Sequence, residues 1–104
     1  MLRARLGPLA EIPTGALRAY AISGVTWPVL AGVIEGELIA TAGVCPHEDV
    51  ALADGDLDGA RLTCPGHGYQ FDLHTGRCRH DADLLLRRYP THVIDGDVWI
   101  DLLG

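Results

Sequence analysis

The chain has 104 residues, enough for one domain, and its 48% hydrophobic and 21% charged residues are typical of a soluble globular protein. Eight basic residues, all arginines, face 14 acidic ones, and the formal net charge of −6 argues against a nucleic-acid or anionic-membrane binder. The longest apolar run, 27–34, is too short to cross a bilayer, and the N-terminus lacks the apolar region of an export signal. We therefore expect a cytoplasmic protein without a membrane contact.

Three cysteines, an odd number, do not suggest a disulfide framework.

Both ends of the chain are rich in residues that favour strands. Thirteen glycines and six prolines support a β architecture with many turns. The strands that we expect, in chain order, span about 2–6, 16–22, 27–34, 37–42, 89–94 and 98–102. Glu35-Gly36 and Asp95-Gly96 are two-residue hairpin turns, the second being the clearest hairpin signal in the sequence. These segments predict an all-β fold, an antiparallel β-sandwich in which two sheets pack on one core.

The middle of the chain has a different composition. Between Gly43 and His80 the residues Gly, Pro, Asp, Cys and His dominate, and only short apolar pieces remain, at 51–53, 61–63 and 70–72. We interpret this stretch as a small subdomain, inserted at about 43–80 into a single domain that spans 1–104, with little core of its own. Such a segment needs something bound to hold it together.

Four potential metal ligands lie in this insertion. They form two arms, Cys45-Pro46-His47 and Cys64-Pro65-Gly66-His67, and sixteen residues separate His47 from Cys64. Zinc fingers usually pair like with like and leave two or more residues between ligands, whereas each arm here mixes a thiolate with an imidazole. A binuclear iron site, in which the cysteines bind one iron and the histidines the other, explains the mixture. A zinc-stabilised interaction module stays open as the alternative.

The pattern Cys-x-His, sixteen residues, Cys-x-x-His resembles the Rieske [2Fe–2S] signature. The flanking sequences CPHEDVALADGDLDG and LTCPGHGYQFDLHTG are typical of Rieske-type ferredoxins, and the closing YPTHVIDGDVWID is similar to that family's last hairpin. The resemblance covers about 33–101 and implies a Rieske-type β-sandwich whose insertion binds one [2Fe–2S] cluster. It implies that Cys45 and Cys64 bind the inner iron, while His47 and His67 bind the outer iron through Nδ1.

The resemblance also implies a function. Rieske-type ferredoxins carry single electrons from an NAD(P)H-dependent flavin reductase to a terminal oxygenase that hydroxylates an aromatic or related hydrophobic substrate. The sequence shows neither the 2-His-1-carboxylate site of the oxygenase nor a dinucleotide fingerprint, so we expect no catalysis by this chain alone. We expect a monomer with transient partners. The stretch GRCRHDADLLLRRYP looks closer to ferredoxins of toluene-4-monooxygenase-type systems than to those of ring-hydroxylating dioxygenases. An iron–sulfur redox sensor would use the same ligands and is a further alternative.

Residues around the ligands predict a low reduction potential. Rieske proteins of respiratory complexes typically have a disulfide between the loops and hydroxyl donors to the cluster. Here Gly66 stands at one disulfide position, Tyr69 at the serine position and Phe71 at the tyrosine position. We therefore expect the low end of the Rieske range of about −150 to +300 mV. The remaining candidates are interpreted as a free thiol (Cys78), surface histidines (His74, His80, His92) and core or core-edge tryptophans (Trp27, Trp99).

Overall fold

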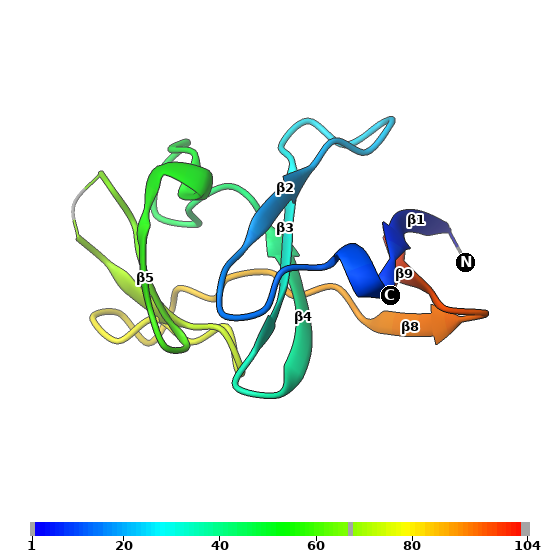
Figure 1. The fold of residues 1–104 in the computed structure, drawn as a ribbon. Coiled ribbons are helices and arrows are strands. Elements are labelled where there is room, and N and C mark those ends of the chain that lie inside the picture. The colour runs from blue at the N-terminus through cyan, green and yellow to red at the C-terminus, as the bar shows by residue number, and fades with distance from the viewer. Residues whose placement is uncertain (1, 67, 103–104) are drawn as a thin grey trace.

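The computed structural model describes residues 2–66 and 68–102 and contains three antiparallel sheets of three strands each (Figure 1). The strands are β1 (Arg3–Pro8), β2 (Arg18–Tyr20), β3 (Val29–Ile34), β4 (Glu37–Ala42), β5 (Asp56–Asp58), β6 (Arg61–Thr63), β7 (Gln70–Asp72), β8 (Thr91–Ile94) and β9 (Asp97–Asp101). Two short 3-10 helices, η1 (Leu9–Glu11) and η2 (Leu52–Asp54), complete the elements of the described residues. No helix within these ranges is long and apolar enough to cross a membrane.

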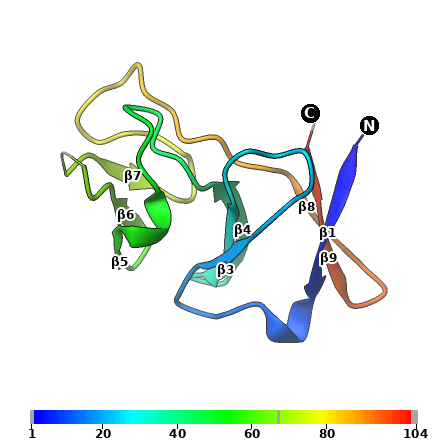
Figure 2. The same ribbon diagram turned by 90° about the horizontal axis from the view of Figure 1, so that it is seen from above.

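The three sheets follow one another along the molecule. The terminal sheet has the order β1-β9-β8, the central sheet β2-β3-β4, and the insertion sheet β5-β6-β7 (Figure 2). Strand β1 pairs with β9, from Arg3 opposite Asp101 to Pro8 opposite Asp97, so the two ends of the chain lie side by side. The expected all-β antiparallel fold is confirmed, and the insertion occupies the end of the molecule opposite both termini.

The two hairpins predicted from two-residue turns are present. Glu35 and Gly36 have φ of 50° and 82°, and Asp95 and Gly96 have 51° and 81°. Two successive residues at positive φ identify type I′ turns, whose twist matches that of the strands they join. Strand β4 follows the first turn and delivers the chain directly to the first ligand arm.

The central sheet is buried on both faces. Along β3, Val29 and Ala31 face the terminal sheet and pack with Ala40, Tyr89 and Ile100. The alternate residues Leu30 and Ile34 face the insertion, because successive side chains of a strand point to opposite sides. The central sheet therefore serves as the platform on which the insertion is built.

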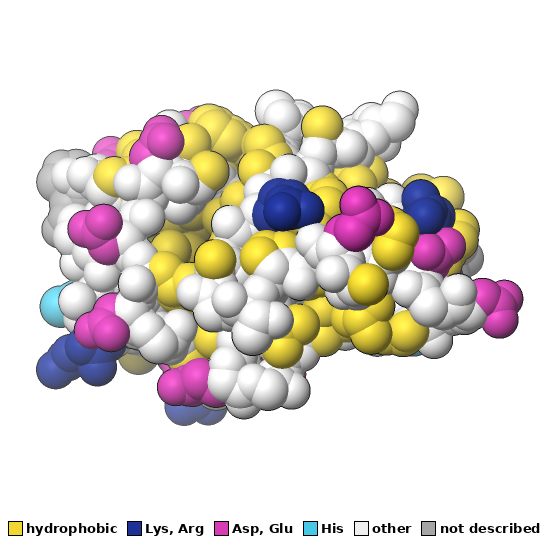
Figure 3. All heavy atoms as spheres, viewed as in Figure 1, with side chains coloured by type: hydrophobic (Ala, Val, Ile, Leu, Met, Phe, Trp, Pro, Cys, Tyr) yellow, Lys and Arg dark blue, Asp and Glu magenta, His cyan; other side chains and the backbone are white. Residues whose placement is uncertain are grey.

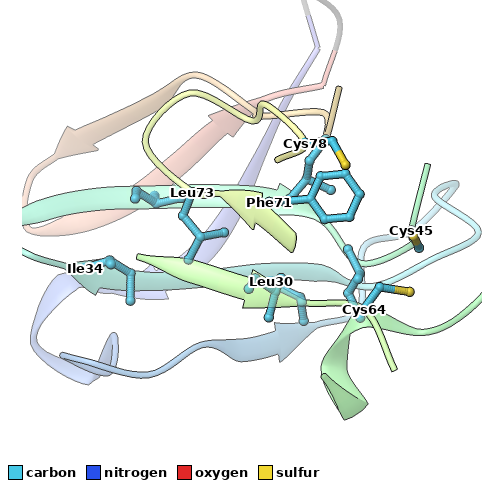
Figure 4. Packing of buried hydrophobic residues seen from close by; sticks show 11 residues of the cluster. Leu30, Ile34, Cys45, Cys64, Phe71, Leu73 and Cys78 are labelled. Carbon is cyan, nitrogen blue, oxygen red and sulfur yellow. The ribbon is translucent and has the colours of Figure 1, made fainter. Parts of the chain in front are cut away.

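The buried residues of the insertion pack in a core that is shared with the central sheet. The insertion contributes Cys45, Leu52, Leu62, Cys64, Phe71, Leu73 and Cys78, which join Leu30, Ile34, Ile39 and Leu86 in one apolar cluster (Figure 4). In the sequence most of these residues stand singly among polar neighbours, and the apolar pieces around them are no more than a few residues long. Three-residue strands nevertheless bring every second side chain to the same face, and the central sheet supplies the opposing layer.

Two further extended segments lengthen the insertion sheet beyond β7. Phe71 bridges Cys78 and Arg77 bridges Leu85, both antiparallel, so the chain adds 77–79 and then 84–86 beside the named strands. Leu86 is 1% exposed and belongs to the same cluster. The packing of the insertion thus continues a few residues past the predicted end near residue 80.

Candidate metal centre

Each predicted ligand arm begins where a strand ends. The first arm follows β4 and is closed by hydrogen bonds from the N–H of Cys45 to the Val50 carbonyl (3.0 Å) and from the N–H of Val50 to the Glu48 carbonyl (2.8 Å). The second arm follows β6 and is closed by the N–H of Cys64, which donates to the Tyr69 carbonyl at 2.7 Å. Both arms are tight loops that continue from strands paired in a sheet, and the hydrogen bonds across each loop fix the backbone positions of its cysteine.

The two cysteines lie together inside the molecule. Cys45 is 2% and Cys64 1% exposed, and both lie at the edge of the cluster shown in Figure 4. Burial raises the pKa of the Cys45 thiol, and contact with the Cys64 side chain raises it further. The buried Cys45 thiol therefore resists becoming a thiolate, because the negative charge would lack solvation.

Backbone N–H groups point at both sulfurs. Those of His47 and Glu48 act on Cys45 and lower its pKa, in opposition to burial. The N–H of Gly66 lies 3.4 Å from the Cys64 sulfur. Such donors stabilise negative charge on a sulfur ligand and on the metal centre behind it.

His47 is more exposed than the two buried cysteines. Its Nδ1 is 3.8 Å from a carboxylate oxygen of Glu48, and its side chain is 26% exposed. The ring of Tyr69 lies 4.2 Å from it, centroid to centroid, and His80 follows at 5.9 Å from Tyr69. The predicted ligand His67 lies outside the described residues.

These residues fit an iron–sulfur cluster. Soft thiolates and neutral imidazole are ligands that iron–sulfur centres accept, and the N–H donors suit a site that carries negative charge. Within 2–66 and 68–102 no group of three metal-binding side chains forms by itself. The structure thus brings the side chains of Cys45 and Cys64 together, and His47 contacts Cys45 through its backbone N–H, whereas the fourth predicted position is not described.

The other candidates of the sequence analysis are one cysteine, two tryptophans and three histidines. Cys78 is unbridged and buried, as expected, and both tryptophans are half-buried. His80 is exposed beside Tyr69, and His92 is a half-buried residue whose Nε2 lies 2.9 Å from an Asp101 oxygen. His74 is a partly exposed turn residue, but its ring also has two carboxylate partners that the sequence did not indicate.

His74 links the insertion to the hairpin of the central sheet. Its Nδ1 is 2.5 Å from Glu37 and its Nε2 2.8 Å from Glu35, and Arg88 pairs with the other Glu37 oxygen at 2.8 Å. The two glutamates raise the pKa of His74, and His74 in turn lowers that of Glu37. We call Glu35, Glu37, His74 and Arg88 the His74 clamp. Residues 35 and 74 are distant in the sequence, so no local pattern could have shown it.

Comparison with known families and proteins agrees with this geometry. Residues 3–90 match the family described as "Rieske [2Fe-2S] domain". The 3-phenylpropionate/cinnamic acid dioxygenase ferredoxin subunit of Escherichia coli O139:H28 is 39% identical over 100 residues, which cover 91% of this chain and 89% of the relative.

Solved structures are similar over nearly the whole chain. A ferredoxin of Sphingomonas yanoikuyae B1 superimposes with a TM-score of 0.83 at 29% identity, covering 98% of this chain and 100% of that one. A chain in the complex of reduced oxygenase and oxidized ferredoxin of carbazole 1,9a-dioxygenase has a TM-score of 0.81 at 24% identity, with 94% and 91% covered, and shows the shared fold.

Proposed function

Because the chain belongs to the Rieske [2Fe–2S] domain family and its relatives are ferredoxin components rather than catalytic subunits, we propose that it carries single electrons within an oxygenase system. Its cofactor is one Rieske [2Fe–2S] cluster, which supplies reversible one-electron chemistry when bound. The observation that carries the proposal is the buried pair Cys45 and Cys64, with N–H donors to both sulfurs and the more exposed His47 in the first arm.

We assign the cluster ligands as Cys45, Cys64, His47 and His67. The two buried cysteines are suited to the inner iron, since they lie within the apolar cluster. His47 is partly exposed and suited to the outer iron, with its ring edge toward the surface. In this arrangement the cysteines keep water from the inner iron, while the histidine edge gives a partner a short path for the electron.

We propose that an NAD(P)H-dependent flavin reductase donates the electron and that a terminal oxygenase accepts it to hydroxylate an aromatic or related hydrophobic substrate. The relative's name, a dioxygenase ferredoxin subunit, supports an oxygenase as acceptor. It favours a dioxygenase over a toluene-4-monooxygenase-type system, although the stretch 76–90 suggested the latter. A single Rieske domain over 1–104, acting as a cytoplasmic monomer, is the simplest form of such a carrier.

We further propose a potential at the low end of the Rieske range. Phe71, which stands where other Rieske proteins have a tyrosine, is fully buried and has no hydroxyl to offer. Apart from the contact between the two cysteine side chains, the donors to sulfur from described residues are the backbone N–H groups of His47, Glu48 and Gly66. Fewer donors leave the extra negative charge of the reduced state less stabilised, which lowers the potential.

The two alternatives differ in what they predict. Membership of the Rieske family supports an iron–sulfur cluster over a zinc-stabilised interaction module. A redox sensor would use the same cluster, but its partner would respond to the oxidation state without consuming electrons in turnover.

The decisive experiment is an EPR spectrum of the anaerobically purified, dithionite-reduced protein, recorded with its visible spectrum. We expect a red-brown protein with a rhombic signal of low average g. The Cys45→Ala and His67→Ala variants should lose this signal, whereas Cys78→Ala, which removes a buried thiol outside the ligand set, should keep it. A colourless, EPR-silent protein with stoichiometric zinc would refute the carrier function.

A further inference from the structure

Some arginines of this acidic protein form ion pairs with carboxylates of the described residues, and others do not. Arg3, Arg5 and Arg88 form ion pairs with carboxylates, at 2.8 to 2.9 Å. Arg61, Arg77 and Arg79, which are all the arginines of the insertion, form no ion pair with any carboxylate in the described part of the chain. Arg79 only donates to the Gln70 side chain, at 3.3 Å. The insertion therefore has three cations whose charge is not neutralised by a direct partner.

These three arginines line one groove. It is open, has a volume of about 1000 Å³, and runs over the outer face of β6, β7 and the extended segment 77–79. We call it the arginine groove. At the lower left edge of Figure 3, arginine side chains project from the end of the molecule formed by the insertion. Four of the six carboxylates of segment 43–80 (Glu48, Asp49, Asp54, Asp56) lie outside it, whereas Asp58, Asp72 and Glu35 line it together with the arginines.

The carboxylates that do line the groove are partly engaged. Glu35 contacts His74 at 2.8 Å, and an Asp72 oxygen accepts the N–H of His74 at 2.8 Å. Asp58 lies opposite Arg61 in the register of β5 and β6. At the far side of the sheet, Arg77 and Arg79 are alternate residues of one extended segment and are both exposed. Their Cα atoms are thus roughly 7 Å apart, the spacing of alternate side chains in any extended peptide.

The arginine groove continues toward the proposed electron exit. Arg79 precedes His80, whose ring lies 5.9 Å from Tyr69, and Tyr69 in turn lies 4.2 Å from His47. A protein that covers the His47 edge therefore meets Arg79 a short distance away. Although the chain as a whole carries a net charge of −6, Arg77 and Arg79 give an acidic protein a local attraction on this face.

We propose that the arginine groove docks an acidic, extended segment of the protein that exchanges electrons with this carrier. Alternate carboxylates of the segment pair with Arg77 and Arg79, and Arg61 extends the contact across the sheet. Such pairing orients the partner over the His47 edge and makes the association sensitive to salt. The inference rests on the carrier function proposed above, because only that function places a protein partner at this end of the molecule.

The test uses the cluster-loaded protein and a fluorescent synthetic peptide of alternating glutamate and serine as the probe, with binding followed by anisotropy. The Arg77→Gln/Arg79→Gln variant should weaken binding roughly threefold to tenfold, as expected for the loss of two surface ion pairs. The control is Arg18→Gln/Arg87→Gln, which changes the net charge equally. Arg18 and Arg87 donate to backbone carbonyls outside the groove, so this control should stay within roughly twofold of the wild type.

The outcomes are distinguishable from those of the carrier proposal. Equal weakening by both double variants, or no binding of the peptide at low salt, would refute the docking inference while a rhombic EPR signal still supported the carrier. A zinc protein without the EPR signal would remove the electron-exchange partner and thereby overturn both proposals. Binding that depends on Arg77 and Arg79 and disappears at high salt supports the groove.

Discussion

The two ends of the molecule are stabilised in different ways. The terminal sheet joins strands of up to six residues from both ends of the chain and is reinforced by Arg3–Asp101 and Arg5–Asp97. The insertion sheet is made of three-residue strands, and its apolar cluster includes two thiols that are predicted ligands. We therefore expect the insertion, but not the terminal sheet, to depend on what its cysteines bind.

Removal of the cluster should have the largest effect on the difference between the two sheets. In the metal-free protein we expect amide protection in 43–86 to fall at least roughly tenfold, equivalent to about 1.4 kcal/mol, because buried thiols lose the centre that unites them. Protection in β1, β8 and β9 should change little. Hydrogen exchange followed by mass spectrometry measures both regions in one sample. An equal loss of protection in both sheets would contradict the distinction.

Matched core truncations sharpen the same comparison. Phe71→Ala in the insertion and Ile100→Ala in the terminal sheet both remove fully buried side chains, and each should cost about 2–5 kcal/mol of unfolding free energy. Only Phe71→Ala should also release the cluster faster, since Phe71 belongs to the same apolar cluster as Cys45 and Cys64. Denaturant unfolding gives the free energies, and loss of visible absorbance under a chelator gives the release rates. Equal release rates would show that the two ends are coupled.

The smallest expected effect concerns the His74 clamp, which joins the insertion to the central sheet. The pKa of His74 is higher in the folded protein than in the unfolded chain, where it is near 6.5. The contact therefore stabilises the fold fully at pH values below 6.5, and this contribution is lost as the pH rises through the folded pKa. The pKa of Glu37 is lower in the folded protein than in the unfolded chain, where it is near 4.5. This contact stabilises the fold fully at pH values above 4.5, and its contribution is lost as the pH falls through the folded pKa.

The clamp should therefore contribute most between about pH 4.5 and 6.5. His74→Gln should lower the unfolding free energy within that window and flatten its pH dependence above pH 6.5, where the wild type loses the His74 contribution. The control His80→Gln changes an exposed histidine that stacks only on Tyr69 among the described residues, and its pH profile should follow the wild type. A wild-type profile for His74→Gln would mean that the clamp adds nothing to stability in solution.

The sequence by itself determined the local features. Glu35-Gly36 and Asp95-Gly96 require positive φ at two successive residues, so the turn type and the strands around it follow from short-range chemistry. The two Cys-x-His-like arms are equally local, and their spacing sufficed to predict the family that residues 3–90 match.

Only the tertiary structure decided what long-range packing controls. The single apolar residues of the insertion became a core because the central sheet supplies a facing layer, which no window of sequence contains. His74 meets Glu35 and Glu37 because the insertion packs against the hairpin of the central sheet, and the three arginines share a groove because β6, β7 and the segment 77–79 are neighbours in the insertion sheet. Register and sheet order depend on which side chains meet in three dimensions, so contacts between distant segments cannot be read from residue patterns alone.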